Sequence, residues 1–211
     1  MSHHTPSPAR DAGPTRGIRR ARAVGLLIVA GAALAACAPG ASPAAVSTAH
    51  SLHDASAAAE SDLQAARAAT ADFADLELAQ AAGYASTIDD LGCFQDEDKG
   101  GMGLHYLDAA QLDDVLDVER PEALVYELDP AGAPAALVGL EFIVPVDAWT
   151  SDEPPTLFGN ELHRHSVLPL WVIHAWVHRE NPDGVLSDYN PDVALCPDGV
   201  PIFGVDLPKS G

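Results

Sequence analysis

The sequence predicts an α+β domain in which an N-terminal helical segment packs on a mainly antiparallel sheet of four or more strands. Three observations indicate this class. Residues 51–82 are rich in alanine and contain neither proline nor glycine, a composition that favours helix. From residue 102 onward, short apolar segments alternate with turn-forming Gly, Pro, Asn and Asp, which is typical of strands. Helices followed by a run of strands are the element order of the α+β class.

Apolar residues recur at helical spacing within residues 51–82, so we expect either one long helix or two shorter ones. Ser51 or Thr70 offers a hydroxyl group that could cap a helix start. Gly83 follows the last of these apolar residues and suits the left-handed conformation that often ends a helix. The helical segment is therefore expected to end at Gly83 and Tyr84.

Four segments are expected to form strands, because they combine β-branched or aromatic residues with flanking turn signals. They are residues 102–107, 123–128, 136–144 and 167–178. The second and third segments flank Asp129-Pro130-Ala131-Gly132-Ala133-Pro134, which predicts a hairpin. After the fourth, Asn181-Pro182-Asp183-Gly184 predicts a type I turn. A short helix is expected within residues 108–121.

The first 36 residues have the composition of a bacterial lipoprotein signal peptide. Five arginines and one acidic residue precede or flank an apolar run over residues 23–35. This run is shorter than the roughly 20 residues that span a bilayer. It ends in Leu34-Ala35-Ala36-Cys37, which resembles a lipobox, so Cys37 is expected to become the first mature residue and to carry diacylglycerol and palmitate. An ordinary secretory signal with a chance cysteine is the alternative.

Two further boundaries follow from the composition after the signal. Residues 37–50 consist mostly of Pro, Ala, Gly and Ser and are expected to form a flexible tether. Residues 51–211 are expected to form a single acidic α+β domain, which is long enough for a real core. The export route, general secretory or twin-arginine, is left open by the residues around Arg19-Arg20.

Net charge narrows the classes of partner. Five of the 11 basic residues and one of the 31 acidic residues precede Cys37, so the whole-chain charge of −20 becomes −24, from 6 basic and 30 acidic residues. This balance argues against a nucleic-acid partner, which needs clustered Lys and Arg. It also disfavours direct adhesion to anionic lipid, so the lipid on Cys37 is expected to hold the protein at the extracytoplasmic face of the cell membrane. The acidity itself fits solubility, salt adaptation or cation binding.

Cys93 and Cys196 are expected to form a disulfide, because an even pair of cysteines in an oxidising compartment normally pairs. Closing a loop of about 100 residues contributes on the order of 4–5 kcal/mol to stability in the chain-entropy model. A two-cysteine metal site is the alternative, although neither cysteine belongs to a Cys-x-x-Cys motif.

Three polar residues interrupt apolar strands: His105, Glu141 and His174. A buried carboxylate needs a partner or a raised pKa. We therefore expect the three side chains to converge on one face of the sheet and to line a pocket for a divalent metal or a small polar ligand. Two imidazoles and one carboxylate suit zinc or another transition metal. The alternative is a set of buried polar residues that satisfy one another and the backbone.

The remaining motifs give weaker evidence for a functional site. His163-Arg164-His165 contains a His-x-His pair like the start of the cupin metal motif, but Leu157 occupies the position expected for glycine and the downstream element is absent. Asp96-Glu97-Asp98 suggests calcium, yet the EF-hand spacing fails and a solvated loop is expected. The sequence has no nucleophile elbow, phosphate loop, dinucleotide fingerprint or His-Glu-x-x-His motif.

The folded part of the chain also contains a series of short motifs. They are Ala82-Gly83-Tyr84, Cys93, Gly101-Met102-Gly103-Leu104-His105-Tyr106, Pro121-Glu122-Ala123-Leu124-Val125-Tyr126-Glu127, Leu137-Val138-Gly139-Leu140-Glu141-Phe142, Leu157-Phe158-Gly159, His174-Ala175-Trp176, Asn181-Pro182-Asp183-Gly184 and Asn190-Pro191. This series resembles a family of exported bacterial proteins whose activity is uncharacterised, and it covers roughly residues 70–197. The resemblance implies one coherent domain with Cys93 and Cys196 at its two ends, and it implies no catalytic roles.

Together these observations predict a membrane-anchored extracytoplasmic lipoprotein that binds a small ligand or a divalent metal at the cell envelope. An envelope enzyme with Glu141 as general base and His105 or His174 as partner is the alternative. A structural or partner-binding envelope protein is a third. A cavity beside a carboxylate with a raised pKa would favour the enzyme, whereas mutually satisfied side chains in a packed sheet would favour the structural role.

Overall fold

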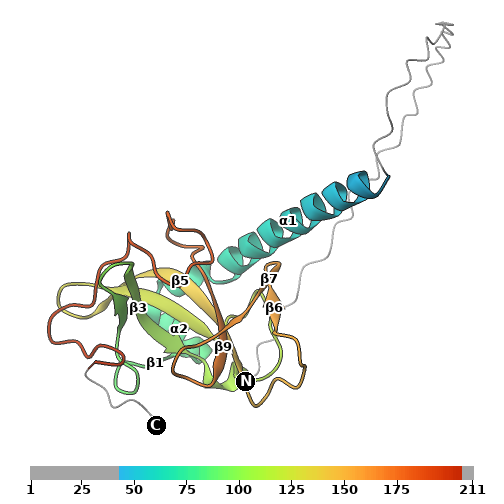
Figure 1. The fold of residues 1–211 in the computed structure, drawn as a ribbon. Helices are drawn as coiled ribbons and strands as arrows, with labels where there is room; N and C mark the ends of the chain where they lie inside the picture. Colours follow the sequence, from blue (N-terminus) through green and yellow to red (C-terminus); the bar gives the residue numbers. More distant parts are fainter. Residues whose placement is uncertain (1–42, 206–211) are drawn as a thin grey trace, which may run out of the picture. The chain divides into compact units, whose positions relative to one another are not determined.

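The computed structural model describes residues 43–205, with side chains described from residue 56 onward. The predicted signal peptide, Cys37 and the first part of the predicted tether lie outside these residues. The described part confirms the α+β class in its coarse form, since two α-helices precede a sheet whose paired strands are all antiparallel (Figure 1). The helical elements are α1 (Pro43–Ala69), the 3-10 turn η1 (Ala71–Ala74) and α2 (Leu76–Ala82).

The start of α1 differs from the prediction. The helix begins at Pro43, so residues 43–50, which were expected to belong to a flexible tether, are helical. Proline is favoured at the first helical position because its fixed φ suits the helix and its missing N–H needs no partner there. No further proline or glycine follows until Gly83, so the alanine-rich sequence supports helix from that point. Within residues 43–205, neither helix has the length and apolar character that a membrane crossing requires.

The predicted helix caps are wrong at the start and confirmed at the end. Ser51 lies inside α1, and the hydroxyl of Thr70 donates to the carbonyl of Ala66 instead of capping the next turn. The cap of α2 is Asp75, whose carboxylate accepts a hydrogen bond from the Glu77 N–H at 3.0 Å. Gly83 ends α2 with a φ of 115°, as the left-handed C-terminal position requires.

Seven strands form the main sheet. Their order is β1-β3-β4-β5-β9-β8, and β2 pairs with β3 beside this path, while β6 and β7 form a separate two-stranded pair. The strands are β1 (Ala85–Ser86), β2 (Phe94–Asp96), β3 (Gly100–Leu107), β4 (Ala123–Leu128), β5 (Pro134–Pro145), β6 (Thr156–Leu157), β7 (Asn160–Glu161), β8 (His163–Arg164) and β9 (Leu170–Ala175).

The four predicted strands are all present, with different lengths. β4 has the predicted bounds, and β3 and β5 extend beyond theirs. β9 covers only part of residues 167–178, because the chain turns after Ala175: the N–H of Trp176 donates to the carbonyl of Val185. The helix predicted within residues 108–121 is reduced to the 3-10 turn η2 (Ala109–Gln111). Carboxylates in this segment accept hydrogen bonds from backbone N–H groups two residues ahead, which stabilises turns instead; they belong to Asp113 and Asp117.

The predicted hairpin, turn and disulfide are confirmed. Asp129 closes the β4–β5 hairpin by accepting hydrogen bonds from two backbone N–H groups of the loop. The N–H of Gly184 donates to the carbonyl of Asn181, which closes the predicted four-residue turn. Cys93 and Cys196 are joined by a disulfide with their Cα atoms 6.0 Å apart.

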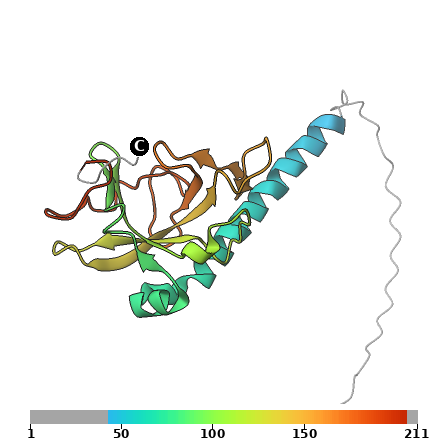
Figure 2. The ribbon, with the colours of Figure 1, turned by 90° about the horizontal axis from the view of Figure 1, so that it is seen from below.

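The two faces of the sheet carry different side chains. One face contributes Leu124, Leu140 and Phe142 to the main core cluster, together with Ala66 and Ala79 of the helices. The other face carries a smaller apolar cluster and the three polar residues singled out from the sequence. The loops that follow β9, drawn in red, lie on the side of β5 away from α2 (Figure 2). These loops and the second face together enclose the candidate site.

Candidate metal centre

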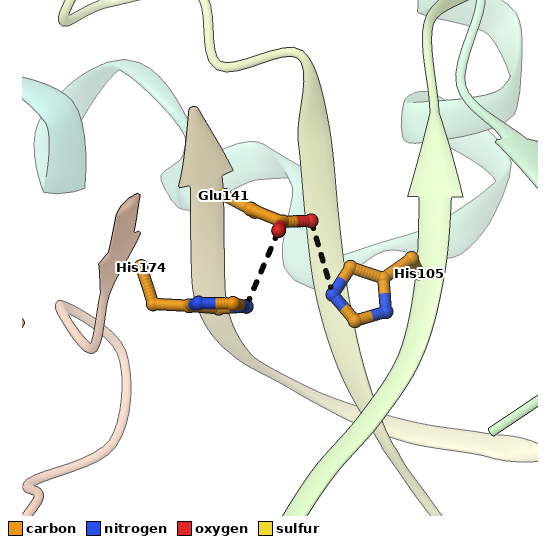
Figure 3. A group of neighbouring side chains, drawn as sticks. All are labelled: His105, Glu141 and His174. Atoms are coloured by element: carbon orange, nitrogen blue, oxygen red, sulfur yellow. Dashed lines mark ion pairs between the residues drawn. The ribbon is translucent and has the colours of Figure 1, made fainter. Parts of the chain in front are cut away.

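His105, Glu141 and His174 converge on one face of the sheet, as the sequence predicts (Figure 3). Glu141 on β5 pairs directly with His174 on β9. His105 on β3 pairs with Val125 of β4, which in turn pairs with Gly139, two residues before Glu141. Because residues two apart on a strand share a face, this register places all three side chains on the same side.

The three side chains direct ligand atoms toward one another. The Nε2 atom of His105 lies 3.3 Å from Oε2 of Glu141, and Nε2 of His174 lies 3.8 Å from Oε1. One ligand atom from each residue lies within 4.8 Å of the other two. Ligand atoms held about 2.0–2.1 Å from a tetrahedral zinc ion are about 3.3 Å apart, so the His105–Glu141 distance already has this spacing, whereas ligand atoms up to 4.8 Å apart would have to approach by as much as about 1.5 Å.

All three residues are buried, with exposed fractions of 5 % for His105, 7 % for Glu141 and 2 % for His174. Among the described residues, none provides a hydrogen-bond partner of suitable geometry for any of the four imidazole nitrogens. Leaving a buried polar atom unpaired costs about 1–3 kcal/mol. The contacts that the rings do make are ion-pair distances to Glu141 and Asp188, so the described residues satisfy the two rings only in part.

Burial controls the charge of the two histidines differently. It lowers the pKa of His105 to about 3, with His174 and His165 acting in the same direction. Burial also lowers the pKa of His174, but the neighbouring Glu141 and Asp188 carboxylates outweigh it, so the net shift is upward. His105 is therefore neutral at ordinary pH, and its ring keeps a lone pair for an ion. Burial raises the pKa of Glu141, against the opposing effect of His174.

Asp188 lies beside the candidate site and was not revealed by the sequence. Its Oδ1 lies 3.6 Å from Nδ1 of His174 and 3.4 Å from Nε2 of His163. A carboxylate behind the second nitrogen of a histidine fixes the ring's tautomer and leaves the first nitrogen free to bind a metal ion. Asp188 lies between two quoted motifs, residues 181–184 and 190–191, but belongs to neither, so its position in the fold is the signal that identifies it.

Two features hold the segment with Asp188 beside the sheet. The indole N–H of Trp176 donates to the carbonyl of Ser187 at 2.5 Å. Downstream, the chain passes against the start of β3, where the N–H of Gly101 donates to the carbonyl of Val193. A Cβ atom on Gly101 would overlap the Ala194 carbonyl, so the glycine permits this close approach. The motif glycine thus helps to place a residue of the site 87 positions later in the chain.

The three converging side chains line a cavity of about 280 Å³. Apolar residues of the sheet and loops form much of its wall, including Ile143, Val172 and Phe203. His163 and His165 also line it, although the failed cupin pattern gave no reason to connect them with the triad. His178 lies beyond the end of β9, away from the three ligands, and its Nε2 contacts the hydroxyl of Thr70 at 2.8 Å. In the acidic segment Asp96-Glu97-Asp98, the Asp96 carboxylate accepts hydrogen bonds from the backbone N–H groups of Asp98 and Lys99, which stabilises a turn.

Comparisons of the chain with protein-family models, curated proteins and solved structures find no significant match. The chemistry of the site therefore carries the functional argument. Two imidazole nitrogens and one carboxylate are a ligand set of divalent transition metals, found at zinc and non-haem iron centres. A bound ion would act there as a Lewis acid and would lower the pKa of a coordinated water molecule.

Proposed function

We propose that this protein is a lipid-anchored, extracytoplasmic domain that binds a divalent transition metal through His105, Glu141 and His174. The observation that carries the proposal is the convergence of two buried imidazoles and a buried carboxylate, whose ligand atoms all lie within 4.8 Å of one another, while neither Nε2 atom makes a well-formed hydrogen bond to the described residues. An ion would satisfy one nitrogen of each ring and the charge of Glu141 together. The Asp188 carboxylate next to His174 supports the same assignment, because metal-binding histidines commonly have such a partner.

Metal content is the first test. Wild-type protein incubated with zinc and then dialysed is expected to retain about one zinc ion per chain, measured by inductively coupled plasma mass spectrometry. His105→Ala and Glu141→Gln are each expected to weaken zinc binding by at least about 100-fold, because even changes behind the ligands cost about 10–100-fold. The same measurement on protein as purified, read for iron, manganese, nickel and copper as well, identifies the preferred ion.

Glu122→Gln is the matched control for Glu141→Gln. Glu122 is also a buried carboxylate, at 1 % exposure, but it lies outside the three-residue group. Its replacement should leave the zinc content unchanged. Dialysed wild-type protein without bound metal, or equal zinc loss in Glu122→Gln and Glu141→Gln, would contradict the proposal.

A metal-free acid–base enzyme is the second candidate, favoured by one observation. Glu141 has a raised pKa through burial and borders a largely apolar cavity, which is the environment of a general acid or base. The metal measurement separates the two functions. A wild-type protein that binds no ion while retaining a small molecule detected by native mass spectrometry would favour the enzyme.

The anchor is tested separately from the site. Cys37→Ser is expected to move the protein from the membrane fraction to the soluble extracytoplasmic fraction, because the acyl chains supply the membrane affinity and the net charge of −24 supplies none. Cell fractionation and intact-mass measurement check this, with wild type expected to show the lipid mass on Cys37. A variant that stays in the membrane fraction would contradict the lipoprotein assignment.

We further infer that the helical segment packs as a unit on the sheet. We also infer that the resemblance to exported bacterial proteins reflects a shared fold.

A further inference from the structure

The cavity in front of the candidate ligands is large enough for a small organic molecule. Its volume of about 280 Å³ exceeds the roughly 150 Å³ of an apolar cavity that holds benzene, and lies just below the roughly 300–1,000 Å³ of pockets for drug-sized ligands. Apolar side chains of its wall include Leu170, Phe94 and Phe203, and the two phenylalanine rings stack with their centroids 4.4 Å apart. The occupant is therefore expected to have an apolar body of about one ring.

Two carboxylates line this cavity, and both count toward its charge. Glu141 belongs to the candidate ligand set, whereas Asp188 lies behind His174, with Oδ1 3.6 Å from Nδ1 of the ring. Burial raises the pKa of Asp188, but the hydrogen bond and charge of His174, together with His163 and His165, outweigh it, so the net shift is downward. Both carboxylates are therefore negative when an ion is bound at Glu141, and a divalent ion together with them sums to zero.

The arginine among the lining residues carries its charge to the other side of the sheet. Arg164 on β8 pairs with Trp171 on β9, while His163 pairs with Val172. Paired residues share a face, and successive residues alternate between faces. Val172 lines the cavity, whereas Trp171 packs against the main core cluster, and the guanidinium lies over the Trp171 ring, 4.7 Å from its centroid. Since no lysine is among the described residues that line the cavity, no lysine or arginine charge offsets the two carboxylates there.

The buried imidazoles of the wall add no charge to this balance. The Nδ1 atom of His165 accepts hydrogen bonds from the backbone N–H groups of Val167 and Leu168, at 3.2 and 2.9 Å. A charged imidazole has protons on both nitrogens, so these bonds require the neutral ring with its proton on Nε2. Burial also lowers the pKa of His165. The two histidines of the candidate ligand set are neutral when they hold an ion, because binding requires the lone pair that a proton would occupy.

Three protein ligands leave one position of a tetrahedral zinc ion open. In a largely apolar wall, this position is the main polar contact that a ligand would find. A carbonyl oxygen can occupy it without bringing a charge, whereas the ion acidifies a coordinated hydroxyl group and so generates an anion. The charge balance and the open position together select an uncharged ligand with a carbonyl oxygen.

We propose that the cavity binds a small uncharged carbonyl compound with an apolar body of about one ring, whose oxygen occupies the open position of the bound ion. This inference rests on the proposed metal function. An anionic ligand would add a negative charge that no lysine or arginine of the wall offsets, and it would be repelled by Asp188. A cationic ligand would meet the ion with its charge already balanced. Asp188 thereby acts as a specificity residue, although it is not one of the three candidate ligands.

Three probes of nearly the same shape and different charge test this inference: benzamide, benzoate and benzamidinium. Isothermal titration calorimetry on the zinc-loaded full chain in detergent measures their affinities. A pH of 7.5 is used, about one unit above the ordinary histidine pKa of about 6.5, where an exposed imidazole carries little charge. Zinc-loaded wild type is expected to bind benzamide about tenfold more tightly than either charged probe. It is also expected to bind benzamide at least tenfold more tightly than the metal-free protein does.

Asp188→Asn is the decisive variant, because asparagine keeps the shape of the side chain and removes its charge. The ratio of benzoate affinity to benzamide affinity is expected to rise about tenfold, as loss of a nearby like charge predicts. The titrations are made at zinc concentrations that saturate the variant, since loss of a carboxylate behind a ligand weakens metal binding by about 10–100-fold. Glu119→Gln is the matched control. It changes the net charge equally at an exposed position outside the cavity and should leave the ratio unchanged.

The zinc content of every sample separates failure of this inference from failure of the proposed function. Zinc-loaded wild type that ignores benzamide, binds it equally without metal, or binds benzoate or benzamidinium as tightly would overturn the uncharged-carbonyl assignment and leave the metal site standing. A zinc-loaded Asp188→Asn variant with the wild-type ratio would overturn the role given to Asp188 and the charge balance with it. Wild-type protein that retains no zinc would overturn both the inference and the proposed function.

Discussion

Replacing Cys93 and Cys196 together by alanine is expected to lower the free energy of unfolding by about 4–5 kcal/mol. The two cysteines are 103 residues apart, so the disulfide removes a large number of conformations from the unfolded chain. A domain of this size is typically stable by about 5–15 kcal/mol, so the loss is a large share of the total. Urea unfolding followed by tryptophan fluorescence measures the change.

Reduction provides the matched control for this double variant. Dithiothreitol should lower the unfolding midpoint of wild type to that of the variant and should leave the variant unchanged, because no disulfide remains in it to reduce. If dithiothreitol lowered the unfolding midpoint equally in wild type and in the double variant, its effect would not come from reduction of this disulfide. A double variant as stable as oxidised wild type would contradict the entropic account of the disulfide.

The second large effect concerns Glu122, whose pKa burial raises to about 8 from an ordinary value of 4.5, against an opposing hydrogen bond from the backbone N–H of Ile143. The folded protein therefore keeps a proton that the unfolded chain releases between these two values. Stability from this group is complete below about pH 4.5 and decreases by about 1.4 kcal/mol per pH unit as the pH rises toward 8. The total is on the order of 5 kcal/mol.

Glu122→Gln is expected to remove this decrease, because the amide stays neutral and its oxygen can still accept the hydrogen bond from Ile143. Compared with wild type, the variant should gain several kcal/mol in relative stability between pH 4.5 and pH 8, measured by urea unfolding at each pH. Glu119→Gln, at an exposed position, is the control and should follow the wild-type profile. Parallel profiles for wild type and Glu122→Gln would show that Glu122 is ionised in the folded protein.

Local sequence pattern was sufficient to predict the strands that carry the candidate ligands. Glu141 and His105 stand out because each interrupts an apolar run, and period-2 alternation places such residues on definite faces. The hairpin of β4 and β5 follows from its turn residues. These features depend on neighbours within a few positions, so a single sequence is enough to identify them.

The remaining parts of the site depend on contacts between distant segments. Asp188 reaches His174 because the turn after β9 is held by Trp176, and no local pattern encodes that contact. The tautomer of His165 depends on a loop whose two N–H groups converge on one ring nitrogen. The early start of α1 has a different cause, since the helix-favouring Pro43 outweighs the loop-like composition before Ser51.

The disulfide also lies beside one part of the cavity wall. Cys196 and Phe203 follow all three candidate ligands along the chain, so they are synthesised after them. The N–H of Phe203 donates to the carbonyl of Cys93, which places this part of the wall next to the disulfide. The disulfide therefore helps to hold Phe203 in the cavity wall, so reducing it should loosen this side of the cavity as well as destabilise the domain.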